Sequence, residues 1–238
     1  MLTNRLYSRT VSTRGGFTLV ELLVVIGIIA ILAGVALGPI TNGIKKAQQS
    51  TGVQEAHALG LAMYSYANDN QQLYPDKSGG GATAKDVAAD LMAGGYVTDP
   101  SIFGLSGDSN PAYIKVNNTT NTAQTITQAQ VSWDFLVNAG NGVNSTSFPF
   151  CPLLWSTLST GGGGTVPSTF NVTAGTAITA VPGAKNPFGT AGVAVFYISN
   201  SAAFNTSTLN AGTLQVNMVS AANNLGGAPA TYAVASGD

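Results

Sequence analysis

An apolar run near the N-terminus constrains what this chain can fold into. Residues 17–37 contain one ionisable side chain, Glu21, among aliphatic, aromatic and small residues. A helix of about 21 residues rises roughly 31 Å, which is close to the ~30 Å thickness of a bilayer's hydrocarbon. A carboxylate costs free energy in hydrocarbon, so we predict a membrane-spanning helix in which Glu21 serves a function.

The charges before the run predict its orientation. Arg5, Arg9 and Arg14 precede it, and no acidic residue does. Basic residues tend to stay on the cytoplasmic side of a membrane. We therefore expect a single-pass protein with its N-terminus in the cytoplasm and the remainder exported.

Two other kinds of N-terminal segment have a similar composition. A cleaved secretory signal uses small residues after its apolar part, and Ala33, Gly34 and Ala36 have that character. A plain uncleaved anchor needs only the apolar length. Neither alternative explains why Glu21 lies inside the run.

The residues around the glutamate carry a family resemblance. Residues 16–23 read GFTLVELL and resemble the N-terminal processing and methylation motif of type IV pilins and type II secretion pseudopilins. The resemblance implies that a prepilin peptidase cleaves between Gly16 and Phe17 on the cytoplasmic side and then methylates the new amino group of Phe17. Residues 1–16 are the leader peptide in this interpretation, and this leader is longer than in many type IV pilins.

Cleavage at that bond gives Glu21 a partner. It leaves the apolar helix in the mature chain as a membrane anchor, and it creates an ammonium group a few residues before the carboxylate. An incoming subunit can present its Phe17 amino group to Glu21 of a subunit that is already assembled, which relieves the cost of a buried charge. We therefore predict that Phe17 and Glu21 direct subunit assembly.

Small residues and a proline characterise the rest of this segment. Gly27, Gly34 and Gly38 are predicted to pack helices together, since a GxxxG separation favours close contact, although glycine is also simply common in membrane spans. Pro39 lacks an amide donor, so a helix kink is expected there. Residues 17–38 are thus the predicted transmembrane and filament-core helix.

An amphipathic extension of the same helix is expected over residues 39–72. Its apolar side is predicted to seat the C-terminal domain. One row on that side comprises Ile44, Ala47, Thr51, Ala58 and Ala62, and an adjoining row comprises Leu59, Met63 and Tyr66. Polar residues and Pro75 end the helix near Asn70.

Two further segments resemble pseudopilins. Residues 66–75 read YANDNQQLYP, a pattern more similar to pseudopilins of the type II secretion type than to adhesive pilins. Residues 95–103 read GYVTDPSIF and resemble a stretch of pseudopilin-like proteins. Both segments favour a secretion pseudopilin.

Residues 73–238 are predicted to form a β-rich globular domain in the periplasm or outside the cell. Thr83 and Asp86 have capping-box spacing at the start of a short helix. Segments rich in β-branched and aromatic residues predict strands at 112–116, 122–127, 130–137, 192–199, 213–219 and 231–235. The expected fold is α+β and pilin-like: about four to six antiparallel strands packed on the long N-terminal α-helix, with long loops.

Composition argues against an enzyme and against a nucleic-acid-binding protein. Only 8% of residues are charged, and without the three arginines before residue 17 the nine basic residues fall to six, against ten acidic ones. Phosphate binding needs clustered cations, so no nucleic acid is expected. The single cysteine, Cys151, excludes an intrachain disulfide, and the single histidine, His57, makes His-based catalytic and metal sites hard to build.

Calcium is the one metal that the sequence leaves open. Ca²⁺ takes roughly six to eight oxygen ligands. The candidates are Asn68–Asn70, Asp76, Asp99 and Asp108–Asn110. Major pseudopilins that this chain resembles often hold calcium in a C-terminal loop, but residues 200–238 contain only Asp238 as an acidic residue. We therefore predict no cofactor and no metal, with structural calcium as the alternative.

These features predict a structural subunit of a type IV pilin-like filament, more specifically a type II secretion pseudopilin. Its partners are expected to be further copies of itself in a helical homo-oligomer, the prepilin peptidase, membrane lipid before assembly, and an inner-membrane assembly platform with its ATPase. The expected location is the bacterial inner membrane and then a periplasmic or cell-surface filament. The alternative is a surface type IV pilus subunit for adhesion or DNA uptake.

Overall fold

The computed structural model places about three fifths of the chain. It describes residues 16–75, 83–105, 126–127, 130–137, 143–146, 149–157, 169–171, 177–180, 188–189, 191–210, 213–217 and 231–235. The chain divides into two compact units, Met1–Ile44 and Lys45–Asp238. The predicted leader lies outside the described residues except for Gly16.

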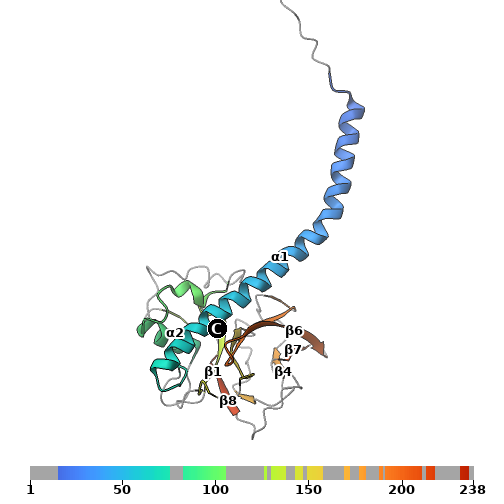
Figure 1. The fold of residues 1–238 in the computed structure, drawn as a ribbon. Helices are drawn as coiled ribbons and strands as arrows, with labels where there is room; N and C mark the ends of the chain where they lie inside the picture. Colours follow the sequence, from blue (N-terminus) through green and yellow to red (C-terminus); the bar gives the residue numbers. More distant parts are fainter. Residues whose placement is uncertain are drawn as a thin grey trace, which may run out of the picture. The chain divides into compact units, whose positions relative to one another are not determined.

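A single long helix, α1, extends from Leu19 to Asp69 (Figure 1). The helix is continuous through Pro39. A continuous helix can be straight or kinked, so the predicted kink stays a prediction. In the first unit, every described residue is exposed. The helix ends close to the predicted position because Gln71 and Gln72 adopt left-handed backbone angles, with φ of 56° and 65°. The Gln72 amide then donates to the Ala67 carbonyl at 2.8 Å, which satisfies one of the helix's last acceptors.

The second unit buries one face of α1. The buried residues of the helix are Gly52, Ala56, Leu59, Gly60, Met63 and Ala67. Leu59 and Met63 confirm one predicted row, but the row through Ala58 was wrong, because Ala58 is exposed and Ala62 only half-buried. The true row lies one residue later, which is a rotation of about 100° around the helix.

The reason for that rotation is aromatic packing on glycine. A Cβ atom at Gly60 would meet the ring of Phe196, and a Cβ atom at Gly52 would meet the ring of Phe188. The two glycines therefore let aromatic rings lie directly against the helix backbone. The His57 ring also contacts Phe196 edge-on, with 5.9 Å between ring centroids.

An antiparallel sheet completes the second unit. Its strands are β1 (Trp133–Val137), β2 (Pro152–Ser156), β3 (Thr169–Asn171), β4 (Ala177–Ala180), β5 (Gly192–Tyr197), β6 (Ala202–Asn210), β7 (Thr213–Asn217) and β8 (Thr231–Ala235). They pair in the order β3-β8-β1-β2-β5-β6-β7-β4, and each pairing is antiparallel. The long helix followed by this sheet confirms the α+β prediction.

The strand predictions were partly correct. Four of the predicted segments contain β1, β5, β7 and β8. The segment 112–116 lies outside the described residues, as does 122–127 except for its last two positions, which are not in a strand. The strands β2, β3, β4 and β6 had no counterpart in the prediction, so the described residues form eight strands where four to six were expected.

The core of the second unit lies at the central strands. All residues of β1 and β2 are buried, including Trp133 and Trp155. The buried carboxylate of Asp134 accepts a hydrogen bond from Trp155 Nε1 at 3.1 Å. Because a buried polar group without a partner is costly, this bond fixes how the two strands face each other.

A second helix, α2 (Ala84–Ala93), lies beside the C-terminal turns of α1 (Figure 1). The carboxylate of Asp86 accepts hydrogen bonds from the Thr83 amide at 2.9 Å and the Thr83 hydroxyl at 2.7 Å, which confirms the predicted capping box. A short 3₁₀ helix, η1 (Pro100–Phe103), follows, and Asp99 caps it by accepting from the Ser101 amide.

Candidate assembly site

The candidate site is the first turn of α1. Thr18 immediately precedes the helix, so it occupies the N-cap position, and Glu21 is the third helical residue. The Glu21 Oε2 atom accepts from the Thr18 amide at 2.9 Å and from the Thr18 hydroxyl at 2.8 Å. The Glu21 amide in turn donates to the Thr18 hydroxyl oxygen at 3.2 Å. This reciprocal arrangement is a capping box.

The capping box gives Glu21 a local role in a single chain. A carboxylate in the first turn is favoured by the unpaired amides and the positive end of the helix dipole. Both of these hydrogen bonds use Oε2, which leaves Oε1 without a hydrogen-bond donor among the described residues. The carboxylate is thus held in place while one of its oxygens stays available to another donor.

Phe17 and Gly16 lie at the open end of this turn. Phe17 is 78% exposed, and no side chain or distant backbone approaches Gly16 within 4 Å of where a Cβ atom would be. A peptidase therefore meets no folded obstacle at this bond among the described residues. The cleavage and the methylation of Phe17 stay predictions.

The glycines predicted to pack helices face open space. A Cβ atom at Gly27, Gly34 or Gly38 would have nothing within 4 Å among the described residues. The described residues supply no packing partner for these glycines, so this role also stays a prediction. Near Pro39, the Thr41 hydroxyl donates to the Gly38 carbonyl at 2.9 Å and satisfies an acceptor beside the proline.

The first unit exposes an unusually large amount of apolar side chain. In the described part of the chain, α1 is the one helix that is long and apolar enough to cross a membrane, and none of its most apolar window is buried. Its exposed large residues include Leu19, Leu23, Ile28, Leu32 and Val35. A surface of this kind is stable only when lipid or protein covers it.

Cys151 and His57 do not form a reactive pair in the described structure. Cys151 is buried, and burial raises the pKa of its thiol to about 12, so it stays protonated near neutral pH and is a poor nucleophile. His57 lies on α1 and packs against the Phe196 ring. The burial of Cys151 gives it the role of a small core residue.

The described members of the calcium candidates have other partners. Asp69 accepts from the Tyr96 hydroxyl at 2.9 Å, Asn70 donates to the Tyr66 carbonyl at 2.8 Å, and Asp99 caps η1. Among the described residues, no three His, Cys, Asp or Glu side chains gather where they could hold a metal ion. Asp76 and Asp108–Asn110 lie outside the described residues.

Comparison with known proteins gives a match that covers the first turn of α1. Residues 12–37 match the family model for the prokaryotic N-terminal methylation motif. No curated protein and no solved structure matches the chain. The matched segment includes Gly16, Phe17 and Glu21 and runs into the exposed apolar helix.

The motif and the long apolar helix that contains most of it fit the class of type IV pilins and pseudopilins. They support a type IV pilin-like subunit with an N-terminal helix suited to membrane anchoring. For such a subunit, processing by a prepilin peptidase and filament assembly are the general expectations that accompany the motif.

Proposed function

We propose that this chain is a structural subunit of a pseudopilus of the type II secretion type. The observation that carries the proposal is the methylation motif at residues 12–37, which leads into an apolar helix with no buried residue before Lys45. The chain itself catalyses nothing in this proposal. The peptidase, the assembly platform and the ATPase are separate proteins.

The proposed sequence of events uses the first turn of α1 twice. The subunit first resides in the inner membrane as a single-pass protein, with Glu21 held by its capping box to Thr18. After cleavage, the methylated amino group of Phe17 in an incoming subunit pairs with Glu21 of its assembled neighbour. The ion pair favours the filament over the membrane because it gives a counter-charge to a carboxylate that has only hydrogen bonds in apolar surroundings.

The choice of a pseudopilin over a surface pilin rests on residues that follow the methylation motif. Residues 66–75 and 95–103 resemble pseudopilin segments, and the first of these includes the end of α1. The weakly charged surface offers no clustered cations for DNA uptake, since Lys45 and Lys46 are the one adjacent basic pair. The filament is accordingly proposed to be periplasmic.

The test is to express the chain with a secretion assembly system and, separately, with a surface pilus system, each with and without prepilin peptidase. Electron microscopy of the cells and of sheared fractions should show peptidase-dependent filaments with the secretion system. Filaments formed only with the pilus system would overturn the pseudopilin proposal in favour of the surface pilin. Filaments that form without the peptidase would contradict the processing step.

A further inference from the structure

Five triplets of the form Asn-x-Ser/Thr occur in this chain, and they begin at residues 117, 118, 144, 171 and 205. In an exported protein such a triplet is the acceptor pattern for an N-linked oligosaccharide. Asparagine, serine and threonine are abundant here, so the pattern alone selects none of the five. Asn144 and Asn205 are the two whose side chains the structure describes, and their surroundings differ.

The segment 143–146 lies against the turn that ends α1. The Tyr74 amide donates to the Val143 carbonyl at 2.9 Å. Two residues further along the segment, the Ser145 amide donates to the Gln72 carbonyl at 2.8 Å. These bonds fix the backbone on both sides of the asparagine of this triplet.

The Asn144 side chain is exposed, and the third residue of the triplet orients its carboxamide. Its Oδ1 atom accepts from the Thr146 amide at 2.8 Å and from the Thr146 hydroxyl at 2.6 Å. Donors on the amide oxygen stabilise negative charge there, which eases the loss of a proton from Nδ2. The hydroxyl that an Asn-x-Ser/Thr triplet requires is therefore already placed on the acceptor side chain.

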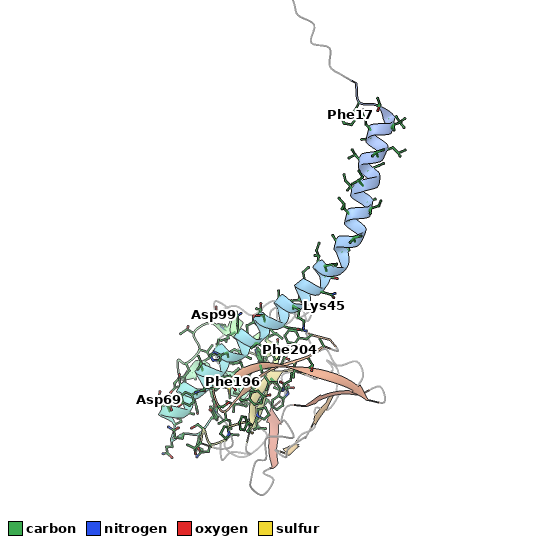
Figure 2. The ribbon with its side chains drawn as sticks, turned by 45° about the vertical axis from the view of Figure 1, so that its right-hand side comes forward. Phe17, Lys45, Asp69, Asp99, Phe196 and Phe204 are labelled. Carbon is green, nitrogen blue, oxygen red and sulfur yellow. The ribbon has the colours of Figure 1, made fainter. Side chains whose placement is uncertain are left out.

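Asn205 is the internal comparison. It lies in β6, directly after Phe204, which Figure 2 labels. Asn205 is half-buried, and its Nδ2 atom donates to the Tyr197 hydroxyl at 2.7 Å. Its backbone is also paired with Val193 of β5. A transferase would have to break this hydrogen bond and withdraw a paired strand before it could reach the atom that reacts.

We propose that Asn144 is the acceptor of an N-linked oligosaccharide, which a membrane oligosaccharyltransferase transfers from a lipid diphosphate. The Nδ2 atom forms a bond to the anomeric carbon of the first sugar. The bond between that carbon and the diphosphate oxygen breaks, and the lipid diphosphate leaves with the electron pair. Nδ2 gives up one proton to a base of the transferase, so the product is a neutral glycosyl amide.

The site goes beyond the proposed function and rests on it for one condition, the export of the second unit. Transferases of this kind act on exported chains. The acceptor segment lies beside the residues that follow α1, whereas the assembly step proposed above uses the first turn of that helix. The modification and the assembly can therefore be measured separately.

The test uses the full-length chain, purified in detergent and incubated with a purified oligosaccharyltransferase and a lipid-linked oligosaccharide. Mass spectrometry of proteolytic peptides should find the glycan on Asn144, with occupancy about ten-fold lower on Asn205. Thr146→Ala should lower the occupancy of Asn144 by about ten-fold, because it removes the hydroxyl. Thr146→Ser keeps a hydroxyl and should retain most of the glycan.

Synthetic peptides with the sequences of residues 139–150 and 200–210 are the matched controls. Neither peptide keeps the folded surroundings of its asparagine, so the transferase should modify the two to a similar extent. Similar modification of the peptides would show that the fold, and not the local sequence, distinguishes Asn144 from Asn205.

Three results would overturn the site. The first is a folded chain without the glycan on Asn144, whether or not the 139–150 peptide is modified. The second is equal occupancy of Asn144 and Asn205 in the folded chain. The third is poor modification of the 200–210 peptide, which would assign the difference to local sequence. Filaments play no part in this reaction, so a chain that accepts the glycan but forms no filaments would contradict the proposed function alone.

Discussion

Replacing Glu21 with valine is expected to leave the subunit in the membrane and to lower the assembled fraction at least about ten-fold. The substitution removes a carboxylate from the apolar run, so insertion should be unchanged or improved. It also removes the partner proposed for the Phe17 amino group, which would then enter the filament core as an unpaired charge. Fractionation of membranes and sheared filaments measures both quantities in the same cells.

Glu21→Gln separates the charge from the cap. A glutamine at this position can still accept from the Thr18 amide, as glutamate does at 2.9 Å, but it carries no charge. We expect this variant to assemble almost as poorly as Glu21→Val. Leu22→Val, an apolar exchange at the next position, should assemble normally. Normal assembly of the glutamine variant would show that the cap, and not the ion pair, is what assembly needs.

Replacing Gly60 with alanine is expected to destabilise the second unit by about 2 kcal/mol. The added methyl group would meet the ring of Phe196, which is fully buried in β5. Overpacking of this kind costs roughly 1 to 3 kcal/mol, and it outweighs the gain of up to about 1 kcal/mol from removing a helical glycine. Urea unfolding of the full chain in detergent, followed by the fluorescence of Trp133 and Trp155, measures the change.

A surface position on the same helix is the control for Gly60. Ser65 is exposed and its hydroxyl donates only to the Leu61 carbonyl, so Ser65→Ala should change the free energy of unfolding by less than about 0.5 kcal/mol. An unchanged or raised urea midpoint for Gly60→Ala would contradict the close packing of α1 on Phe196.

Local patterns predicted the elements that depend on local physics. The apolar run predicts α1. Thr83 and Asp86 predict the start of α2, because two side chains three residues apart can hydrogen-bond the free backbone amides at a helix N-terminus. The segment 192–199 contains β5, whose valine, alanine and aromatic residues are typical of a buried strand. These features need no information from distant parts of the chain.

Other elements depend on partners that the sequence does not reveal. β2 reads PLLWS without alternation because it is buried along its whole length, and β6 reads AAFNTSTLN, which is mostly polar. Both strands are defined by their pairing with β5. The face of α1 was misjudged by one residue for the same reason, since Gly52 and Gly60 look like poor core residues until aromatic rings cover them.

The site was predicted in part. Gly16, Phe17 and Glu21 were selected from the motif, and they lie together at the exposed start of α1. The hydrogen bonds of Thr18 were missed, although its spacing to Glu21 is the same capping-box signal that predicted Thr83 and Asp86. No residue in the described part of the chain lies near Gly27, Gly34 or Gly38, so their predicted packing role is not tested by a single subunit.

In the proposed function, cleavage before Phe17 turns a membrane helix into an assembly element. Mass spectrometry of the mature protein, taken from cells that contain prepilin peptidase, tests this step. We expect an N-terminal peptide that begins at Phe17 and carries one added methyl group. A mature chain that retains Met1, or one that begins between Val35 and Pro39, would contradict it.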